Sequence, residues 1–118
     1  MEADHVFTGL PVADLDAALA WYERLLGRAP DMAPNDDERC WRLAETAWIY
    51  VVRDAARAGN GLVTILVGDL AAFTAETATR GIDAGEVEQR PGLFRRCVLE
   101  DPAGNRLAVA EPLPAERG

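Results

Sequence analysis

The residue in this chain best suited to acid–base chemistry is its one histidine, His5. An imidazole titrates near neutral pH, so it could act as a general acid or base at the rim of a binding site. His5 follows Asp4 near the N-terminus, where it could equally be an ordinary solvated histidine at the start of a strand. No second catalytic group stands at a defined spacing from it. We therefore keep His5 and the phenol of Tyr50 as candidate catalytic residues, and the catalytic set is otherwise unknown.

The two cysteines, Cys40 and Cys97, lack the CxxC spacing of redox and zinc motifs. We expect both to be reduced and buried, where they act as small apolar side chains, and a catalytic thiol is the alternative. The sequence contains no GxSxG, no HExxH, no P-loop and no GxGxxG after a predicted strand. The sequence therefore contains none of these catalytic motifs, from which a type of reaction could be inferred.

The charge balance disfavours some partners. Twelve basic residues against 20 acidic ones give a net charge of −8, which repels phosphate backbones and argues against a nucleic-acid partner. The acidic run at 36–38 could attract a cationic ligand or could simply be a solvated turn. No apolar run is long enough to span a bilayer, and the acidic N-terminus is unlike a signal peptide. We therefore expect a cytoplasmic protein with no membrane partner.

Two segments of the chain share one pattern. Residues 9–27 read GLPVADLDAALAWYERLLG, and residues 64–81 read TILVGDLAAFTAETATRG. In each, an apolar stretch ends in Val, a small residue and Asp-Leu, and a helical pattern then closes on Gly. The two aspartates, Asp14 and Asp69, lie 55 positions apart in a chain of 118 residues. The sequence therefore indicates two copies of one supersecondary unit.

Each unit is expected to contain a strand, a helix and three further strands. The helices are predicted to begin after the N-cap residues Asp14 and Asp69 and to end at Gly27 and Gly81. The strands are predicted over residues 5–12, 28–35, 39–44 and 47–53, and again over 61–67, 85–90, 94–99 and 106–111.

These elements make up a single domain. Its predicted parts are module one at 1–53, a linker at 54–60, module two at 61–112 and a loose tail at 113–118. We predict an α+β fold in which two tandem βαβββ modules form a curled, mixed β-sheet cleft.

Three motifs carry a family resemblance: VADLDAALAWYERLLG at 12–27, VGDL at 67–70 and DPAGNRLAVAEP at 101–112. With them the chain resembles the vicinal oxygen chelate superfamily, which includes glyoxalase I, extradiol dioxygenases, fosfomycin-resistance enzymes and bleomycin-resistance proteins. The resemblance covers nearly the whole chain and implies the paired-module fold. It also implies a cleft that commonly holds a divalent metal, ligated from the first and last strands of each module.

The metal-ligand positions hold residues that do not bind metals well. When the Asp-Leu dipeptides are aligned, these positions are occupied by Phe7, Tyr50, Leu62 and Ala108. Phe, Leu and Ala carry no ligand atom, and neutral Tyr rarely ligates. His5 shares the strand face of Phe7, but Glu111 is three positions after Ala108 and should point to the other face. We therefore predict no metal and no other cofactor, which argues against metal-dependent glyoxalase or dioxygenase activity.

Without the chelate, strand alternation selects residues for an apolar, aromatic cleft, a composition typical of small-molecule sites. Trp and Tyr offer flat stacking surfaces with one donor each, although the same aromatics could instead fill the core or a dimer interface. The inward face of strand 94–99 is not fixed by the sequence. The predicted ligand-binding residues are Phe7, Trp41, Trp48, Tyr50, Leu62, Thr64, Phe94, Arg96, Arg106 and Ala108.

Three functions are compatible with this site. The first is a metal-independent protein that sequesters a hydrophobic or aromatic molecule, with a cationic ligand as an option, as bleomycin-resistance proteins do. The second is a glyoxalase-like lyase or isomerase that acts on a small carbonyl compound through His5, Tyr50 or Arg106. The third is a structural or regulatory partner domain without a ligand. The resemblance also implies a homodimer, and the ligand itself is not identified by the sequence.

Overall fold

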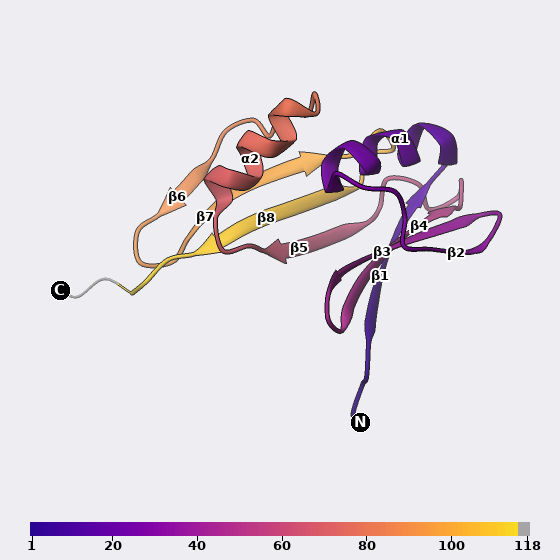
Figure 1. Cartoon of the computed structure of the whole chain (residues 1–118), viewed down its shortest axis with the longest axis horizontal. Helices are drawn as coiled ribbons and strands as arrows, with labels where there is room; N and C mark the ends of the chain where they lie inside the picture. The colour runs from indigo at the N-terminus through magenta and orange to yellow at the C-terminus, as the bar shows by residue number, and fades with distance from the viewer. Residues whose placement is uncertain (116–118) are drawn as a thin grey trace.

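Two βαβββ modules lie side by side along the long axis of the computed structural model (Figure 1). The structure describes residues 1–115, so the last part of the predicted tail, residues 116–118, lies outside the described residues. The predicted α+β fold with two tandem modules is confirmed. Within the described part of the chain, neither helix is both long and apolar enough to cross a membrane.

Module one folds into a four-stranded mixed sheet, here called sheet one. Its elements are β1 (Val6–Val12), α1 (Leu15–Leu26), β2 (Met32–Asn35), β3 (Glu38–Ala44) and β4 (Ala47–Arg53). The strand order is β1-β4-β3-β2, with β1 parallel to β4 and the other pairs antiparallel. β2 begins at Met32, whereas the strand was predicted to begin at residue 28. Pro30, which has no N–H to donate to a neighbouring strand, lies in the segment that was predicted to be part of the strand but is not.

Module two repeats this arrangement as sheet two. Its elements are β5 (Leu62–Leu66), α2 (Leu70–Thr79), β6 (Glu88–Arg90), β7 (Phe94–Glu100) and β8 (Arg106–Pro112), in the strand order β5-β8-β7-β6. β6 is shorter than the predicted strand 85–90. Gly85 has a φ of 70°, which takes the chain out of the extended conformation before Glu88.

Aspartate caps begin both helices, as predicted. Asp14 Oδ1 accepts a hydrogen bond from Ala17 N at 3.1 Å, and Asp69 Oδ1 accepts one from Ala72 N at 3.0 Å. Gly27 ends α1 in the left-handed region, with a φ of 73°. The amphipathic pattern of α1 turns one face to the sheet. The buried residues of that face are Leu15, Ala18, Tyr22 and Leu25.

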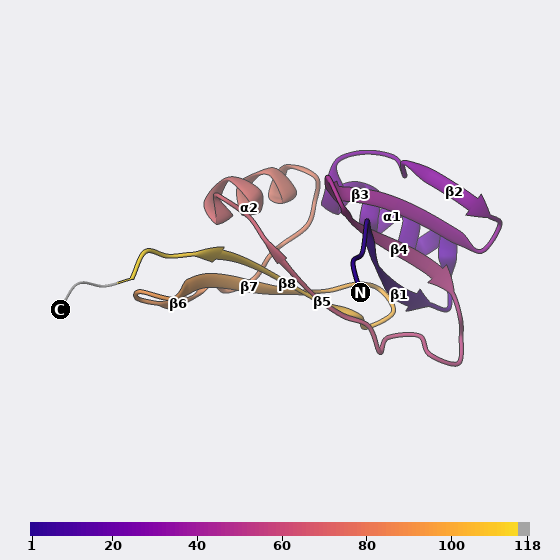
Figure 2. The ribbon, with the colours of Figure 1, turned by 90° about the horizontal axis from the view of Figure 1, so that it is seen from below.

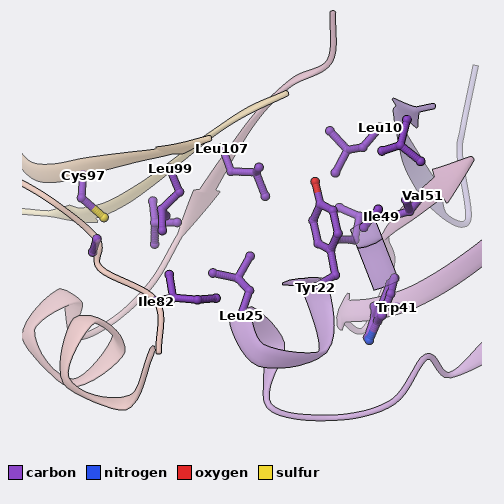
Figure 3. Close-up of a cluster of buried hydrophobic side chains, with 14 of the residues drawn as sticks. Leu10, Tyr22, Leu25, Trp41, Ile49, Val51, Ile82, Cys97, Leu99 and Leu107 are labelled. Atoms are coloured by element: carbon purple, nitrogen blue, oxygen red, sulfur yellow. The ribbon is translucent and has the colours of Figure 1, made fainter. Parts of the chain in front are cut away.

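The two sheets do not close on each other (Figure 2). Each helix packs on one face of its own sheet, and the apolar residues between them form one core that continues across the joint of the modules. At this joint Leu25 of α1 points toward Ile82, which follows α2 (Figure 3). No helix or strand within residues 1–115 covers the second face of either sheet, and these two faces are called the uncovered faces.

A buried hydrogen-bond network fastens the β7–β8 turn to module one. The fully buried Asn105 donates from Nδ2 to Pro11 O at 2.7 Å and to Asp101 Oδ2 at 2.8 Å. Its Oδ1 accepts from Gly61 N at 2.6 Å, and the Tyr22 hydroxyl donates to Asp101 Oδ2 at 2.7 Å. Because buried polar groups are costly unless they are paired, this network favours one relative position of the two modules.

The Tyr22 hydroxyl makes the stability of the fold sensitive to alkali. Burial, and then the hydrogen bond to Asp101, raise the pKa of Tyr22 far above its ordinary value. An unfolded tyrosine loses its proton near pH 10, whereas folded Tyr22 keeps it, so this stabilisation is complete below about pH 10 and declines as the pH rises further. We expect Tyr22→Phe to lower the free energy of unfolding by about 1–2 kcal/mol at pH 8 and to flatten the decline above pH 10.

Urea denaturation at intervals from pH 8 to pH 11 measures this effect. Tyr50→Phe is the control, because the Tyr50 hydroxyl makes no hydrogen bond with residues 1–115 and the chain has two tyrosines. An identical alkaline decline in Tyr22→Phe and the unmodified protein would contradict the assignment.

Candidate functional site

The uncovered face of sheet one carries aromatic side chains. In the parallel pair β1–β4, Phe7 lies opposite Trp48 and Gly9 lies opposite Tyr50. Strand alternation turns these residues away from the core, whereas Ile49, between the two β4 aromatics, is buried beneath α1. The predicted face of β1 and β4 therefore agrees with the structure.

A hollow of about 320 Å³ lies on this face, and we call it the sheet-one hollow. Beside it, the Phe7 and Trp48 rings stack with centroids 5.3 Å apart and an interplanar angle of 17°. The indole Nε1 of Trp48 is buried and has no acceptor among residues 1–115. The hollow is lined by Phe7, Met32, Pro34, Glu38, Cys40 and Tyr50.

Gly9 makes room for the Tyr50 ring. A Cβ built at Gly9 would lie 2.6 Å from both Cζ and Oη of Tyr50, closer than any real side chain approaches another. The strand pairing places the two residues directly opposite each other. A glycine at this position therefore lets the phenol lie across β1 at the edge of the hollow.

The uncovered face of sheet two holds a second hollow, of about 410 Å³, here called the sheet-two hollow. The antiparallel pairing sets Arg96 opposite Ala110 and Val98 opposite Ala108. This register, which the sequence did not fix, places Arg96 and Val98 on the uncovered face of β7. Phe94 shares this face, and the Arg96 guanidinium lies 4.7 Å from its ring centroid. The hollow is lined by Leu62, Val63, Thr64, Arg96, Val98, Arg106 and Ala108.

The metal-ligand positions of the superfamily lie on these uncovered faces but do not offer a ligand set. Phe7 and Tyr50 line the sheet-one hollow, and Leu62 and Ala108 line the sheet-two hollow. Glu111 points to the opposite face, as expected, where its Oε1 accepts from Leu70 N at 2.9 Å. Among residues 1–115, no three or more His, Cys, Asp and Glu side chains converge. The residues present therefore do not fit the divalent metal of the superfamily.

Trp41 was predicted to line the cleft, and the structure corrects this. The pairing of β3 with β4 shifts by one residue between Arg42 and Ala44. This irregularity sets Trp41 opposite Ile49 instead of Tyr50 and so turns it to the other face. Trp41 is fully buried in the core, and its ring centroid lies 5.8 Å from that of Tyr22.

The three residues considered for catalysis do not meet within one chain. His5 is exposed just before β1 and lines neither hollow, and the N-terminal segment extends away from both helices (Figure 1). Tyr50 lines the sheet-one hollow, whereas Arg106 lines the sheet-two hollow. The chain by itself therefore assembles no acid–base pair from them.

Both cysteines are free and buried, as predicted. Burial raises the pKa of the Cys40 thiol, and the nearby carboxylate of Glu38 raises it further. Burial likewise raises the pKa of Cys97. A raised thiol pKa leaves little thiolate at neutral pH, so neither residue has the character of a catalytic nucleophile.

Four residues that line the sheet-one hollow were absent from the predicted ligand-binding set: Met32, Pro34, Glu38 and Cys40. They lie on β2 and in the first half of β3. The structure pairs Met32 with Cys40, and Cys40 with Tyr50, which brings β2 onto the aromatic face. The alternation across three neighbouring strands is the signal that could have found them.

The described geometry has close counterparts among solved structures. No family model matches the chain, and no curated protein does. A glyoxalase/bleomycin resistance protein from Catenulispora acidiphila is 36% identical, with a TM-score of 0.86 over 91% of this chain and 96% of that one.

Two more distant structures share the fold alone. A bleomycin-binding protein complexed with bleomycin is 20% identical, with a TM-score of 0.70 over 92% of this chain and 98% of that one. A lactoylglutathione lyase from Agrobacterium tumefaciens is 22% identical, with a TM-score of 0.70 over 94% and 95% of the two chains.

Proposed function

The chain belongs to the glyoxalase/bleomycin resistance protein family of the vicinal oxygen chelate superfamily, and from this premise we propose that it binds a small aromatic molecule without a metal ion. The observation that carries the proposal is the stacked pair of Phe7 and Trp48 beside the sheet-one hollow, on a face that no described helix or strand covers. Such a pair offers a flat apolar surface for a further ring. The binding of bleomycin by a protein of the same fold supports this choice.

The buried indole N–H of Trp48 adds a polar requirement to this surface. It has no acceptor within the described chain, and an unpaired buried donor is unfavourable. A ligand that displaces the atoms covering Trp48 Nε1 and places an oxygen or nitrogen acceptor there would satisfy this donor. The proposed ligand is therefore aromatic with at least one acceptor atom.

Binding of N-phenyl-1-naphthylamine, an uncharged aromatic probe whose fluorescence rises in apolar surroundings, tests the proposal. We expect saturable binding that Trp48→Ala weakens about tenfold, because the stacking partner and its apolar contact are lost. Leu93→Ala is the control, since Leu93 is 61% exposed and lines neither hollow. Absence of saturable binding, or an equal loss in both variants, would refute the proposal and favour a partner domain without a ligand.

We also propose that a second copy of the chain covers the uncovered faces. Leu62 and Leu66 are 73% and 66% exposed on β5, an edge strand, and Phe7 is 45% exposed on β1, the edge of the other sheet. Apolar patches of this kind on a small protein commonly mark an interface. Glu38 on sheet one and the arginines of sheet two carry opposite charges. We therefore propose a homodimer with pairing of unlike faces, in which sheet one of each copy faces sheet two of the other copy.

Light scattering after size exclusion measures the mass in solution. We expect a dimer that Leu66→Glu dissociates, whereas the control Val87→Glu, at an exposed apolar residue outside both hollows, leaves it intact. A monomer at all concentrations would refute the homodimer without affecting the probe-binding experiment.

A further inference from the structure

The sheet-two hollow combines apolar side chains with two guanidinium groups. Leu62 and Val98 are 73% and 45% exposed in it, and Arg96 and Arg106 lie in the same lining. No carboxylate belongs to this lining. The hollow is therefore locally basic in a chain whose net charge is −8.

Arg96 is held in place but is incompletely paired. Its Nη2 donates to Glu88 Oε2 at 2.7 Å, and its guanidinium lies 4.7 Å from the Phe94 ring centroid. Its Nε is buried and has no acceptor within residues 1–115. Glu88 in turn accepts from Arg90 Nε at 2.9 Å, so its negative charge is shared between two arginines. Arg96 therefore keeps a free donor and part of its positive charge.

Arg106 faces the same hollow with its guanidinium unengaged. Its backbone N–H donates to Gly61 O at 3.0 Å, whereas its side chain makes no hydrogen bond or ion pair with the described residues. The nearest carboxylate by strand register is Glu100, directly opposite on β7, and the two form no ion pair. Arg106 is therefore available to a ligand.

On these grounds we infer that the ligand of this protein is an aromatic anion: in the homodimer proposed above, its ring packs on the Phe7–Trp48 stack of one copy, and its charged oxyanion group is bound by Arg96 and Arg106 in the sheet-two hollow of the second copy. The inference rests on the proposed function and on the proposed pairing of unlike faces, and it adds the charge class of the ligand. Guanidinium groups bind carboxylate and sulfonate oxygens with charge-assisted hydrogen bonds, which are stronger than neutral ones. The apolar part of the ligand packs on Leu62 and Val98, and the anionic part accepts from the guanidinium N–H groups of Arg96 and Arg106 that have no partner among residues 1–115.

Two fluorescent probes that differ by one sulfonate test this inference. 8-Anilinonaphthalene-1-sulfonate is N-phenyl-1-naphthylamine with an added sulfonate, so the ratio of the two affinities measures how much the anionic group contributes to binding. We expect the sulfonate probe to bind about tenfold more tightly, and Arg96→Gln or Arg106→Gln to remove most of that ratio, because the affinity for the sulfonate probe should fall far more than the affinity for the uncharged probe. Thioflavin T, a cationic aromatic probe, should bind weakly.

Matched variants separate a local effect from net charge. Arg95→Gln removes one charge from the same strand but on the opposite face, where Arg95 lies 3.6 Å from Glu111, and it should leave the ratio intact. Glu88→Gln removes the carboxylate that competes for Arg96, and it should tighten binding of the sulfonate probe. Naphthalene-1-acetate should displace the bound sulfonate probe at lower concentration than the uncharged naphthalene-1-acetamide, which extends the result to carboxylates.

The outcomes distinguish the two proposals. Absence of binding of the uncharged probe would refute the proposed function. Equal affinities for the two probes, tighter binding of thioflavin T, or an equal effect of Arg95→Gln and Arg106→Gln would each refute the anionic ligand while leaving the proposed function in place. Unchanged melting temperatures of the variants confirm that binding, not folding, is measured.

Discussion

Trp41→Ala is expected to lower the free energy of unfolding by about 3–5 kcal/mol, the cost of removing a fully buried large aromatic from a core. The substitution also removes the indole N–H, which donates to Arg28 O at 3.2 Å, and the ring that packs near Tyr22. Little of the resulting cavity can collapse, because β3 is paired on both sides. Urea denaturation followed by circular dichroism measures the loss.

Trp48→Ala provides the comparison within the same pair of strands. Trp48 stacks on Phe7 at an uncovered face, so its loss should cost about 1 kcal/mol of stability. The two substitutions are therefore expected to have different effects: Trp41→Ala mainly lowers the free energy of unfolding, and Trp48→Ala mainly lowers the affinity for the aromatic probe. Similar losses of stability in the two variants would contradict the assignment of Trp41 to the core and Trp48 to the site.

Asn105→Ala is expected to destabilise the protein by about 3 kcal/mol, although it removes only a small polar side chain. The substitution leaves Gly61 N without its partner, and it takes one donor each from Asp101 Oδ2 and from Pro11 O, which keeps the hydrogen bond from Gly59 N at 3.2 Å. The site is fully buried, so water cannot replace these bonds without opening the joint between the modules.

Asn60→Ala is the matched control, because Asn60 is exposed in the linker and its side chain makes no hydrogen bond with the described residues. Urea denaturation of both variants gives the comparison, and the control should lie within about 0.5 kcal/mol of the unmodified protein. A loss below about 1 kcal/mol for Asn105→Ala would show that the modules keep their position without this network.

Much of the fold followed from local patterns. The repeated Asp-Leu motif set the module boundaries, because an aspartate at an N-cap and a glycine at a helix end act on the nearest turn of chain alone. The period of two in β1, β4 and β8 placed Phe7, Tyr50 and Ala108 on the uncovered faces. The same pattern placed Glu111 on the helix-covered face of sheet two, so that it does not lie with the residues at the metal-ligand positions of the superfamily.

Other properties depended on contacts between distant segments. A one-residue shift in the pairing of β3 and β4 reversed the face of Trp41, and no local pattern marks that shift.

The sequence by itself thus determined the two modules, the starts of both helices, the end of the first helix and the chemical character of the uncovered faces, because each of these depends on neighbouring residues. The second helix ends at Thr79 with Arg80 as its C-cap, before the predicted Gly81. Only the tertiary structure decided which aromatic belongs to the core and that Tyr22, Asp101 and Asn105 join the modules. It also decided that Trp48 and Arg96 keep unpaired donors on separate sheets. The physical reason is that a donor's partners come from strands and turns far away in the sequence, so its pairing is fixed only when the whole chain is folded.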